Sequence, residues 1–184
     1  MSAIFRYFIF YILVLVLGFI VFRVLVPRDY LKLGKLSPLI AFLQALLFFI
    51  YGGFPSLYLQ KDWPAVSVPL FIHIPGMLFI LIGLSFLIVG MIRLGIDISI
   101  GRGTQELKIS GIYRFSRNPQ AVACGLYVMG FFMLWPSYYA LGWMFLYFFL
   151  IHMMVLAEEE HLKRNHGPRY QAYCEKVPRY FGRI

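Results

Sequence analysis

Long apolar stretches separated by three basic segments constrain this chain more than any other feature. Fifteen of its 17 lysines and arginines lie in segments 23–37, 93–119 and 158–184, and only Arg6 and Lys61 lie elsewhere. A membrane-spanning helix needs about 20 apolar residues, and the stretches between the basic segments carry almost no charge. If each apolar stretch crosses a bilayer, all three basic segments fall on one side, which is the positive-inside pattern. The sequence therefore predicts a polytopic membrane protein.

Composition supports this class. The chain is 61% hydrophobic and 14% charged, whereas soluble domains are about half apolar and a quarter charged. We expect one membrane domain over residues 1–184, because no linker, repeat or low-complexity tract divides it. The net charge of +9 fits the anionic inner leaflet. We expect no nucleic-acid partner, because the sequence carries no nucleic-acid-binding motif.

The fold expected from these patterns is all-α, with about five transmembrane helices and a C-terminal cytoplasmic interfacial helix. The expected spans are 4–26, 38–59, 66–92, 120–135 and 138–156. Pro27 is expected to end the first helix, and Pro69 and Pro75 to make the first turns of the third irregular. The fourth span is short and is followed by a tight turn at Pro136 and Ser137.

Five spans place the two termini on opposite sides, with the N-terminus outside and the C-terminus cytoplasmic. Aromatic residues occur near the two uncharged turns, where they are expected to form a belt at the outer interface. These residues are Tyr58, Trp63, Trp135, Tyr138 and Tyr139.

The first polar segment is the run 101–123, on the side expected to be cytoplasmic. Its Gly101-x-Gly103 is a weak signal, because the strand and helix of a dinucleotide site are missing. Asn118 suits a helix N-cap and Pro119 the first helical turn. A helix N-terminus favours an anion, and Arg117 beside it is able to grip a carboxylate. A simple helix cap is the alternative interpretation of Asn118 and Pro119.

The second polar segment is the run 157–181, where Glu158, Glu159 and Glu160 directly follow an apolar span. Acidic residues are not needed to anchor a cytoplasmic helix end, so they indicate a defined site. The alternative is a solvated helix surface with ion pairs at i,i+4 spacing.

The chain beyond these carboxylates is expected to leave the helix. Gly167 and Pro168 are expected to break it. Tyr170 and Tyr173 share one face of a basic and aromatic tail that lies on lipid headgroups or holds the tail on the bundle.

Neither a disulfide nor a metal site is expected. Cys124 lies in a span and Cys174 lies in the C-terminal segment that is expected to be cytoplasmic, so the two are not expected to form a disulfide. The Glu158-x-x-His161 spacing resembles half of a di-iron motif, but it occurs only once.

Taken together, the polar motifs resemble a known family. They are Gly111-x-Tyr113, Arg117-Asn118-Pro119, Glu158-Glu159 and Gly167-x-x-Tyr170-x-x-Tyr173-x-x-x-Val177-Pro178-Arg179. This combination is similar to the isoprenylcysteine carboxyl methyltransferase and phospholipid methyltransferase family, from about Gly95 onwards. Asn118 stands where the carboxyl methyltransferases have His, as it does in the phospholipid branch. Ala121 replaces a hallmark Tyr, Ala123 a usual Gly, and His166 a common Phe.

The resemblance implies transfer of a methyl group from S-adenosylmethionine to a lipidic or hydrophobic acceptor at the cytoplasmic membrane face. The acceptor would be a prenylcysteine-type carboxylate or a phospholipid amine. The resemblance, with the chemistry of the residues, assigns Glu158 and Glu159 to the ammonium, ribose and sulfonium of the donor. The expected catalytic residues are Arg117 and Arg179, which orient the substrate, and Glu158. The remaining expected donor-binding residues are Gln105, Glu106, Leu107, Tyr113, Asn118 and Pro119.

Two other classes stay open at this point. Membrane sterol reductases that use NADPH have a similar C-terminal pattern with a Tyr-Cys pair, as at Tyr173 and Cys174, although they usually have more spans. The third class is a non-catalytic membrane protein that retains the fold. It is favoured by the absence of the hallmark Tyr, which Ala121 replaces in this chain.

Overall fold

The computed structural model describes residues 3–53, 68–94, 107 and 109–182, and all regular structure within these ranges is helical. The helices are α1 (Ala3–Ile20), the π-helix η1 (Val21–Leu25), α2 (Val26–Leu33), α3 (Pro38–Gly53), α4 (Leu70–Leu94), the 3-10 helix η3 (Gly111–Arg114), α6 (Pro119–Leu134) and α7 (Tyr138–Cys174).

Three helical segments are long and apolar enough to cross a membrane. They are Ile4–Leu33, Leu70–Val89 and Tyr138–Cys174, and the helices Pro38–Gly53 and Pro119–Leu134 are shorter apolar helices. The expected all-α class is therefore confirmed, and the apolar helices indicate an integral membrane protein. Tyr58, Trp63, the end of the second expected span and the start of the third lie outside the described residues.

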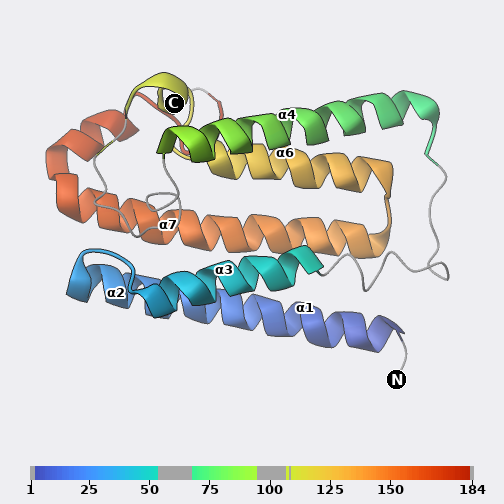
Figure 1. Ribbon diagram of the computed structural model, residues 1–184, viewed down its shortest axis with the longest axis horizontal. Helices are drawn as coiled ribbons and strands as arrows, with labels where there is room; N and C mark the ends of the chain where they lie inside the picture. Colours follow the sequence, from blue (N-terminus) through green and yellow to red (C-terminus); the bar gives the residue numbers. More distant parts are fainter. Residues whose placement is uncertain (1–2, 54–67, 95–106, 108, 183–184) are drawn as a thin grey trace.

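The helices run side by side with alternating direction, and α7 lies between α1 and α3 on one side and α4 and α6 on the other (Figure 1). The N-terminus lies at one end of this bundle. At the other end lie α2, η3 and the residues that follow α7. The described parts of the three basic segments therefore meet at one end, as expected, and we name it the basic end.

The expectation that Pro27 ends the first helix is wrong. The chain stays helical to Leu33 and ends at Gly34, which has a left-handed φ of 67°. The π-helical turn explains this, because the Val26 N–H bonds to the Val21 carbonyl five residues back. Pro27 then occupies the first turn of α2, where its missing N–H costs little.

The helix α7 continues well beyond its apolar part, and this brings its carboxylates to the basic end. Ser137 begins it, because its hydroxyl accepts a hydrogen bond from the Ala140 N–H at 3.0 Å. The expected break is confirmed at Gly167, whose φ of 47° and ψ of −123° are not helical. A glycine suits this position because a positive φ is strained for other residues.

The pair α4 and α6 packs backbone to backbone. A Cβ atom added at Gly83 would lie 2.6 Å from the Ala123 carbonyl oxygen, and one added at Gly130 would lie 2.6 Å from that of Gly76. Such close packing of small residues is typical of helices in membranes. It holds the start of α6, at the basic end, in a fixed place.

Candidate active site

The residues that follow α7, which we call the tail (175–182), are tied to the start of α6 by backbone contacts. The Arg117 N–H donates to the Pro178 carbonyl at 2.9 Å. The Arg179 carbonyl accepts from the Ser116 hydroxyl at 3.2 Å and from the Asn118 amide at 3.1 Å. The two polar segments of the sequence, far apart along the chain, therefore meet at the basic end.

Glu159 lies at the centre of this junction and is buried. Its Oε2 accepts from the Arg179 Nε at 3.0 Å and Nη2 at 2.8 Å, and its Oε1 accepts from the Asn118 amide at 3.2 Å. The Arg117 Nη1 lies 3.5 Å from Oε1. The hydrogen bond to Glu159 is the main cause that raises the pKa of Arg179. The partners of Glu159 come from α6 and the tail, so the i,i+4 alternative does not describe it.

Arg117 points inward. Its side chain is 13% exposed, and Nη1 donates to the Cys174 sulfur. Its Nε is buried and has no hydrogen-bond partner among the described residues. Asn118 stands at the N-cap position of α6, followed by Pro119, but its side chain makes no capping bond and turns to Glu159 instead.

A polar pocket of about 440 Å³ opens beside these groups. Carboxylates and cations from α7, from the tail and from Arg117, which precedes α6, face it together. Its lining is Arg117, Leu156, Glu159, Glu160, Lys163, Tyr170, Gln171, Cys174, Glu175 and Arg179.

Glu158, next to Glu159 in sequence, has different surroundings. It is partly exposed, and no hydrogen bond or ion pair joins it to any other residue in the described ranges. Burial raises the pKa of the Tyr113 phenol, and the nearby negative charge of Glu158 raises it further. The Tyr173 hydroxyl donates to the Tyr113 carbonyl at 2.7 Å, which holds η3 against α7. Glu158 therefore lies near Tyr113 and within reach of the charge of Glu159, but it takes no part in the hydrogen bonds of the Glu159 junction.

Of the expected loop residues, Gln105 and Glu106 lie outside the described residues. Leu107 is described and packs against the cluster of Tyr170, Tyr173 and Val177. Both tyrosines are buried, so they hold the tail on the bundle. The end of the loop thus lies beside a wall of the polar pocket.

The remaining carboxylate, Glu160, and its neighbour His161 join α7 to the first helices. Glu160 pairs with Arg23 at 2.9 Å on a half-exposed surface. The His161 ring stacks on Tyr30 with a centroid distance of 4.0 Å. These contacts help to hold the end of α7 in place.

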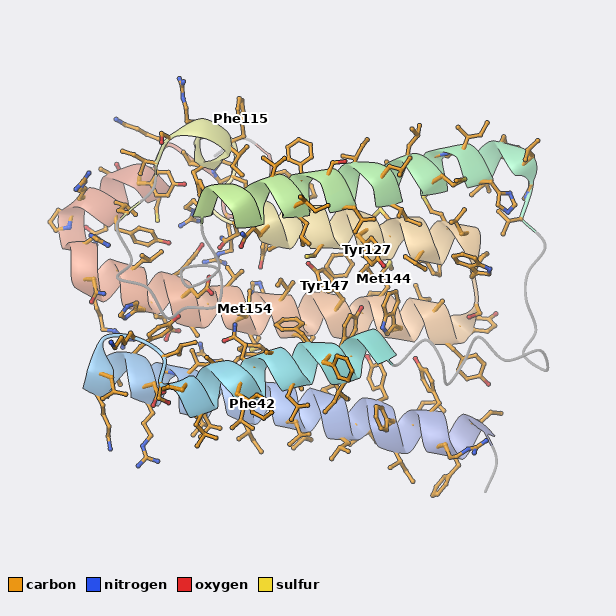
Figure 2. All side chains as sticks on the ribbon, viewed as in Figure 1. Phe42, Phe115, Tyr127, Met144, Tyr147 and Met154 are labelled. Carbon is orange, nitrogen blue, oxygen red and sulfur yellow. The ribbon has the colours of Figure 1, made fainter. Side chains whose placement is uncertain are left out.

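A second, apolar cavity of about 600 Å³ lies deeper in the bundle, between α3, α4, α6 and α7. Its lining is Ala41, Gln44, Ala45, Phe48, Tyr51, Gly52, Leu87, Gln120, Ala121, Cys124, Tyr127, Val128, Phe131, Trp143, Tyr147, Ile151 and Met154. Figure 2 shows Tyr127 and Tyr147 between α6 and α7, and Met154 between α7 and α3. The Tyr147 hydroxyl donates to the Ala121 carbonyl at 2.7 Å, so the hallmark position Ala121 belongs to this wall.

The two spaces lie at a similar level of the bundle. Arg117, just before α6, lines the polar pocket, and Gln120, in the first turn of α6, lines the apolar cavity. On α7, Leu156 lines the polar pocket and Met154 the apolar cavity, two residues apart. Two residues of an α-helix rise about 3 Å and turn about 200°, so the two spaces adjoin opposite faces of α7. Sequence analysis did not identify the apolar cavity, because its walls come from four helices and carry no local motif.

Comparison with known proteins supports a family assignment. The family model of phospholipid methyltransferases matches residues 71–169, slightly more than half of the chain. This stretch contains α4, η3, α6 and α7 as far as the Gly167 break. No curated protein and no solved structure matches the chain. The chain belongs to the phospholipid methyltransferase family and is therefore a methyltransferase that uses S-adenosylmethionine.

Proposed function

We propose that this protein methylates the headgroup amine of a phospholipid, with donor and acceptor meeting at the cytoplasmic membrane face. One observation carries the proposal: a polar pocket and an apolar cavity lie at a similar level of the bundle, and residues of α7 and of the segment at the start of α6 line both. A polar donor and a lipid acceptor need two spaces of opposite character that meet at one point.

The polar pocket fits the methyl donor by its chemistry. S-adenosylmethionine carries an ammonium, a carboxylate and a sulfonium, and it supplies an activated methyl group. The buried Nε of Arg117 offers a hydrogen bond that no described residue takes up, which suits the donor carboxylate. Glu159 adds negative charge to the pocket wall, which favours the sulfonium. Arg179 lines the same space, and Asn118 and Pro119 directly follow Arg117 in the chain.

The other expected residues complete this proposed donor site. Leu107 packs against the cluster that contains Tyr170, and Tyr170 lines the pocket, so we assign the backbone of Leu107 to the adenine of the donor. Gln105 and Glu106, which precede it in the sequence, are proposed to contribute to the same site. Tyr113, whose phenol is close enough to Glu158 for that charge to raise its pKa, is assigned to packing on the donor. Methyl transfer is an in-line displacement, so the main task of these residues is to hold donor and acceptor in line and exclude water.

The apolar cavity suits the acyl chains of the acceptor. Its volume of about 600 Å³ is within the usual range for small-molecule sites, and its walls are mostly apolar. It lies among helices that are apolar enough to cross a membrane, so a lipid has no need to enter water. With its chains in the cavity, a lipid would place its headgroup toward the basic end.

Purified protein in vesicles tests this function. Vesicles that contain phosphatidylethanolamine and donor labelled in the methyl group should yield labelled mono-methylated lipid by mass spectrometry. Vesicles of phosphatidylcholine are the control, because its quaternary nitrogen has no lone pair to methylate. Label in an added prenylcysteine instead of the amine lipid would replace the phospholipid acceptor with a carboxylate acceptor.

A further inference from the structure

We propose that the paired rings of Tyr51 and Trp143 close the far end of the apolar cavity and set the longest acyl chain that the enzyme accepts on its amine phospholipid. The inference rests on the proposed function, in which this cavity holds an acyl chain of the acceptor. It assigns chain-length selection to a contact between α7 and α3, and α3 lies outside the stretch that the family model matches.

The first argument is the extent of the cavity along the bundle. Among the described residues, its lining has two limits on each of three helices, the first toward the basic end: Ala41 and Gly52 on α3, Gln120 and Phe131 on α6, and Met154 and Trp143 on α7. On each helix the two limits lie eleven residues apart, a rise of about 16 Å. The hydrocarbon core of a bilayer is about 30 Å thick, so the cavity has roughly the depth of one leaflet. An acyl chain of one leaflet therefore fits along it.

The second argument is the polarity of the end near the basic end. Gln44 and Gln120 line the cavity there, and Figure 2 shows Met154 nearer the basic end than Tyr147. The Gln44 amide donates to the Met154 sulfur at 3.7 Å. A thioether is a weak acceptor, so an ester carbonyl of a lipid would be a stronger partner for this amide. A bound lipid is thus oriented with its ester groups toward the basic end and the end of its chain toward Tyr51 and Trp143.

The third argument is that the far end is aromatic and fixed. The Tyr51 and Trp143 rings stack with their centroids 5.1 Å apart and an angle of 4° between their planes. The Trp143 Nε1 donates to the Tyr51 carbonyl at 3.3 Å, and the Tyr51 hydroxyl donates to the Trp143 carbonyl at 3.4 Å. Phe131 of α6 meets the Trp143 ring edge to face at 6.4 Å. Each ring is held by the backbone of the other helix, so an arriving chain cannot displace it without breaking these bonds.

The form of the selectivity follows from the surroundings of the chain. A chain that enters from the membrane exchanges one apolar environment for another, so each methylene within the cavity adds little affinity. A chain longer than the cavity must press against the two rings or fold back, and such overpacking is unfavourable. We therefore expect kcat/KM to be level for chains up to the length of the cavity and to fall steeply beyond it.

The experiment is a competition between amine lipids of increasing chain length. Dipalmitoleoyl, dioleoyl, dieicosenoyl and dierucoyl phosphatidylethanolamine are mixed as equal minor components of vesicles made of dioleoyl phosphatidylcholine, a host that is not methylated and keeps the bilayer thickness constant. Mass spectrometry of the products labelled in the methyl group gives ratios of kcat/KM within one reaction. These ratios do not depend on the amount of folded protein.

Wild type should methylate the two shorter lipids equally and the dierucoyl lipid less than the dioleoyl lipid by about fivefold or more, the lower bound for overpacking. Tyr51→Leu and Trp143→Leu each remove one ring of the pair, from different helices. Each should bring the ratio of dierucoyl to dioleoyl product back toward one and leave the ratio of the two shorter lipids unchanged.

Two controls separate the position of the rings from general effects of substitution. Tyr51→Phe keeps the ring and removes only the hydroxyl, so it should keep the wild-type ratio. Tyr138→Leu removes an exposed aromatic ring at the same end of the bundle that does not line the cavity, and it should also keep that ratio.

The other outcomes overturn the inference in distinguishable ways. Equal methylation of all chain lengths by wild type removes the length limit but leaves the proposed function intact. A limit that persists in both Tyr51→Leu and Trp143→Leu shows that other residues set it, and an equal shift in Tyr138→Leu shows that the effect is not local to the cavity. If wild type binds the donor in calorimetry but methylates none of these lipids, the proposed function fails and the inference fails with it.

Discussion

At the scale of single residues, Arg117 joins the parts of the proposed donor site. Its backbone N–H donates to the Pro178 carbonyl. Its Nη1 donates to the Cys174 sulfur and also lies near the Glu159 carboxylate. Lysine keeps the backbone N–H and the charge but lacks Nε, so it cannot hold Cys174 and Glu159 and also offer the hydrogen bond proposed for the donor carboxylate. We expect Arg117→Lys to fold but to lose roughly ten- to hundredfold in kcat/KM, which is the loss of one charged hydrogen bond. The measurement is methyl incorporation into native lipids, normalised to folded protein.

The matched control is Arg23→Lys. Arg23 pairs with Glu160 on a half-exposed surface, and a lysine ammonium can keep such a pair. Surface pairs contribute about 0–1 kcal/mol, so this variant should be near neutral. Wild-type turnover and Michaelis constant in Arg117→Lys would limit Arg117 to a structural role and leave the donor site to Glu159 and the loop near Leu107.

At the scale of secondary-structure elements, the contact between α4 and α6 depends on glycine. A Cβ at Gly83 would lie 2.6 Å from the Ala123 carbonyl oxygen and 2.8 Å from the Tyr127 nitrogen, and neither backbone atom can move without shifting a helix. We therefore expect Gly83→Ala to lower the free energy of unfolding by about 1–3 kcal/mol, the usual effect of overpacking. Thermal unfolding in detergent measures it.

Gly52 provides the control for this contact. It lies in α3 with no heavy atom within 4 Å of an added Cβ. Alanine favours a helix over glycine by about 1 kcal/mol, so Gly52→Ala should be neutral or stabilising. A destabilisation of the same size in both variants would show that the α4–α6 contact does not explain the effect.

At the scale of the whole molecule, charge predicts how the bundle is oriented in the membrane. The described parts of all three basic segments lie at one end of the bundle, and the N-terminus lies at the other (Figure 1). We propose that the basic end faces the cytoplasm, that residues 1–184 form one domain, and that five helices span the bilayer. A reporter fused after Ile184 should behave as cytoplasmic, and one inserted near Trp63 as external.

Fusions at other sites add a check on this topology. A reporter in the turn between α2 and α3, at Lys35, should share the side of Ile184, because both belong to the basic end. Two reporters at Trp63 and Ile184 on the same side would contradict five spans.

The family match separately selects a methyltransferase over the reductase and the non-catalytic protein that the sequence left open.

Local patterns in the sequence were sufficient for the class and for several boundaries. Hydropathy and charge predicted a helical membrane protein, and α6 and α7 begin within one residue of their expected starts. Gly167 breaks the last helix as expected. These features depend on length, apolar content and the backbone freedom of single residues, which act over a few neighbouring positions.

Tertiary structure alone decided how those elements meet. Pro27 fits inside a continuous helix because a π turn precedes it, a choice that local propensity does not reveal. Glu158 and Glu159 are adjacent in sequence, yet it is Glu159 that meets Arg117 and Arg179. Contacts between residues far apart in the chain depend on the packing of whole helices, and no local pattern encodes that packing.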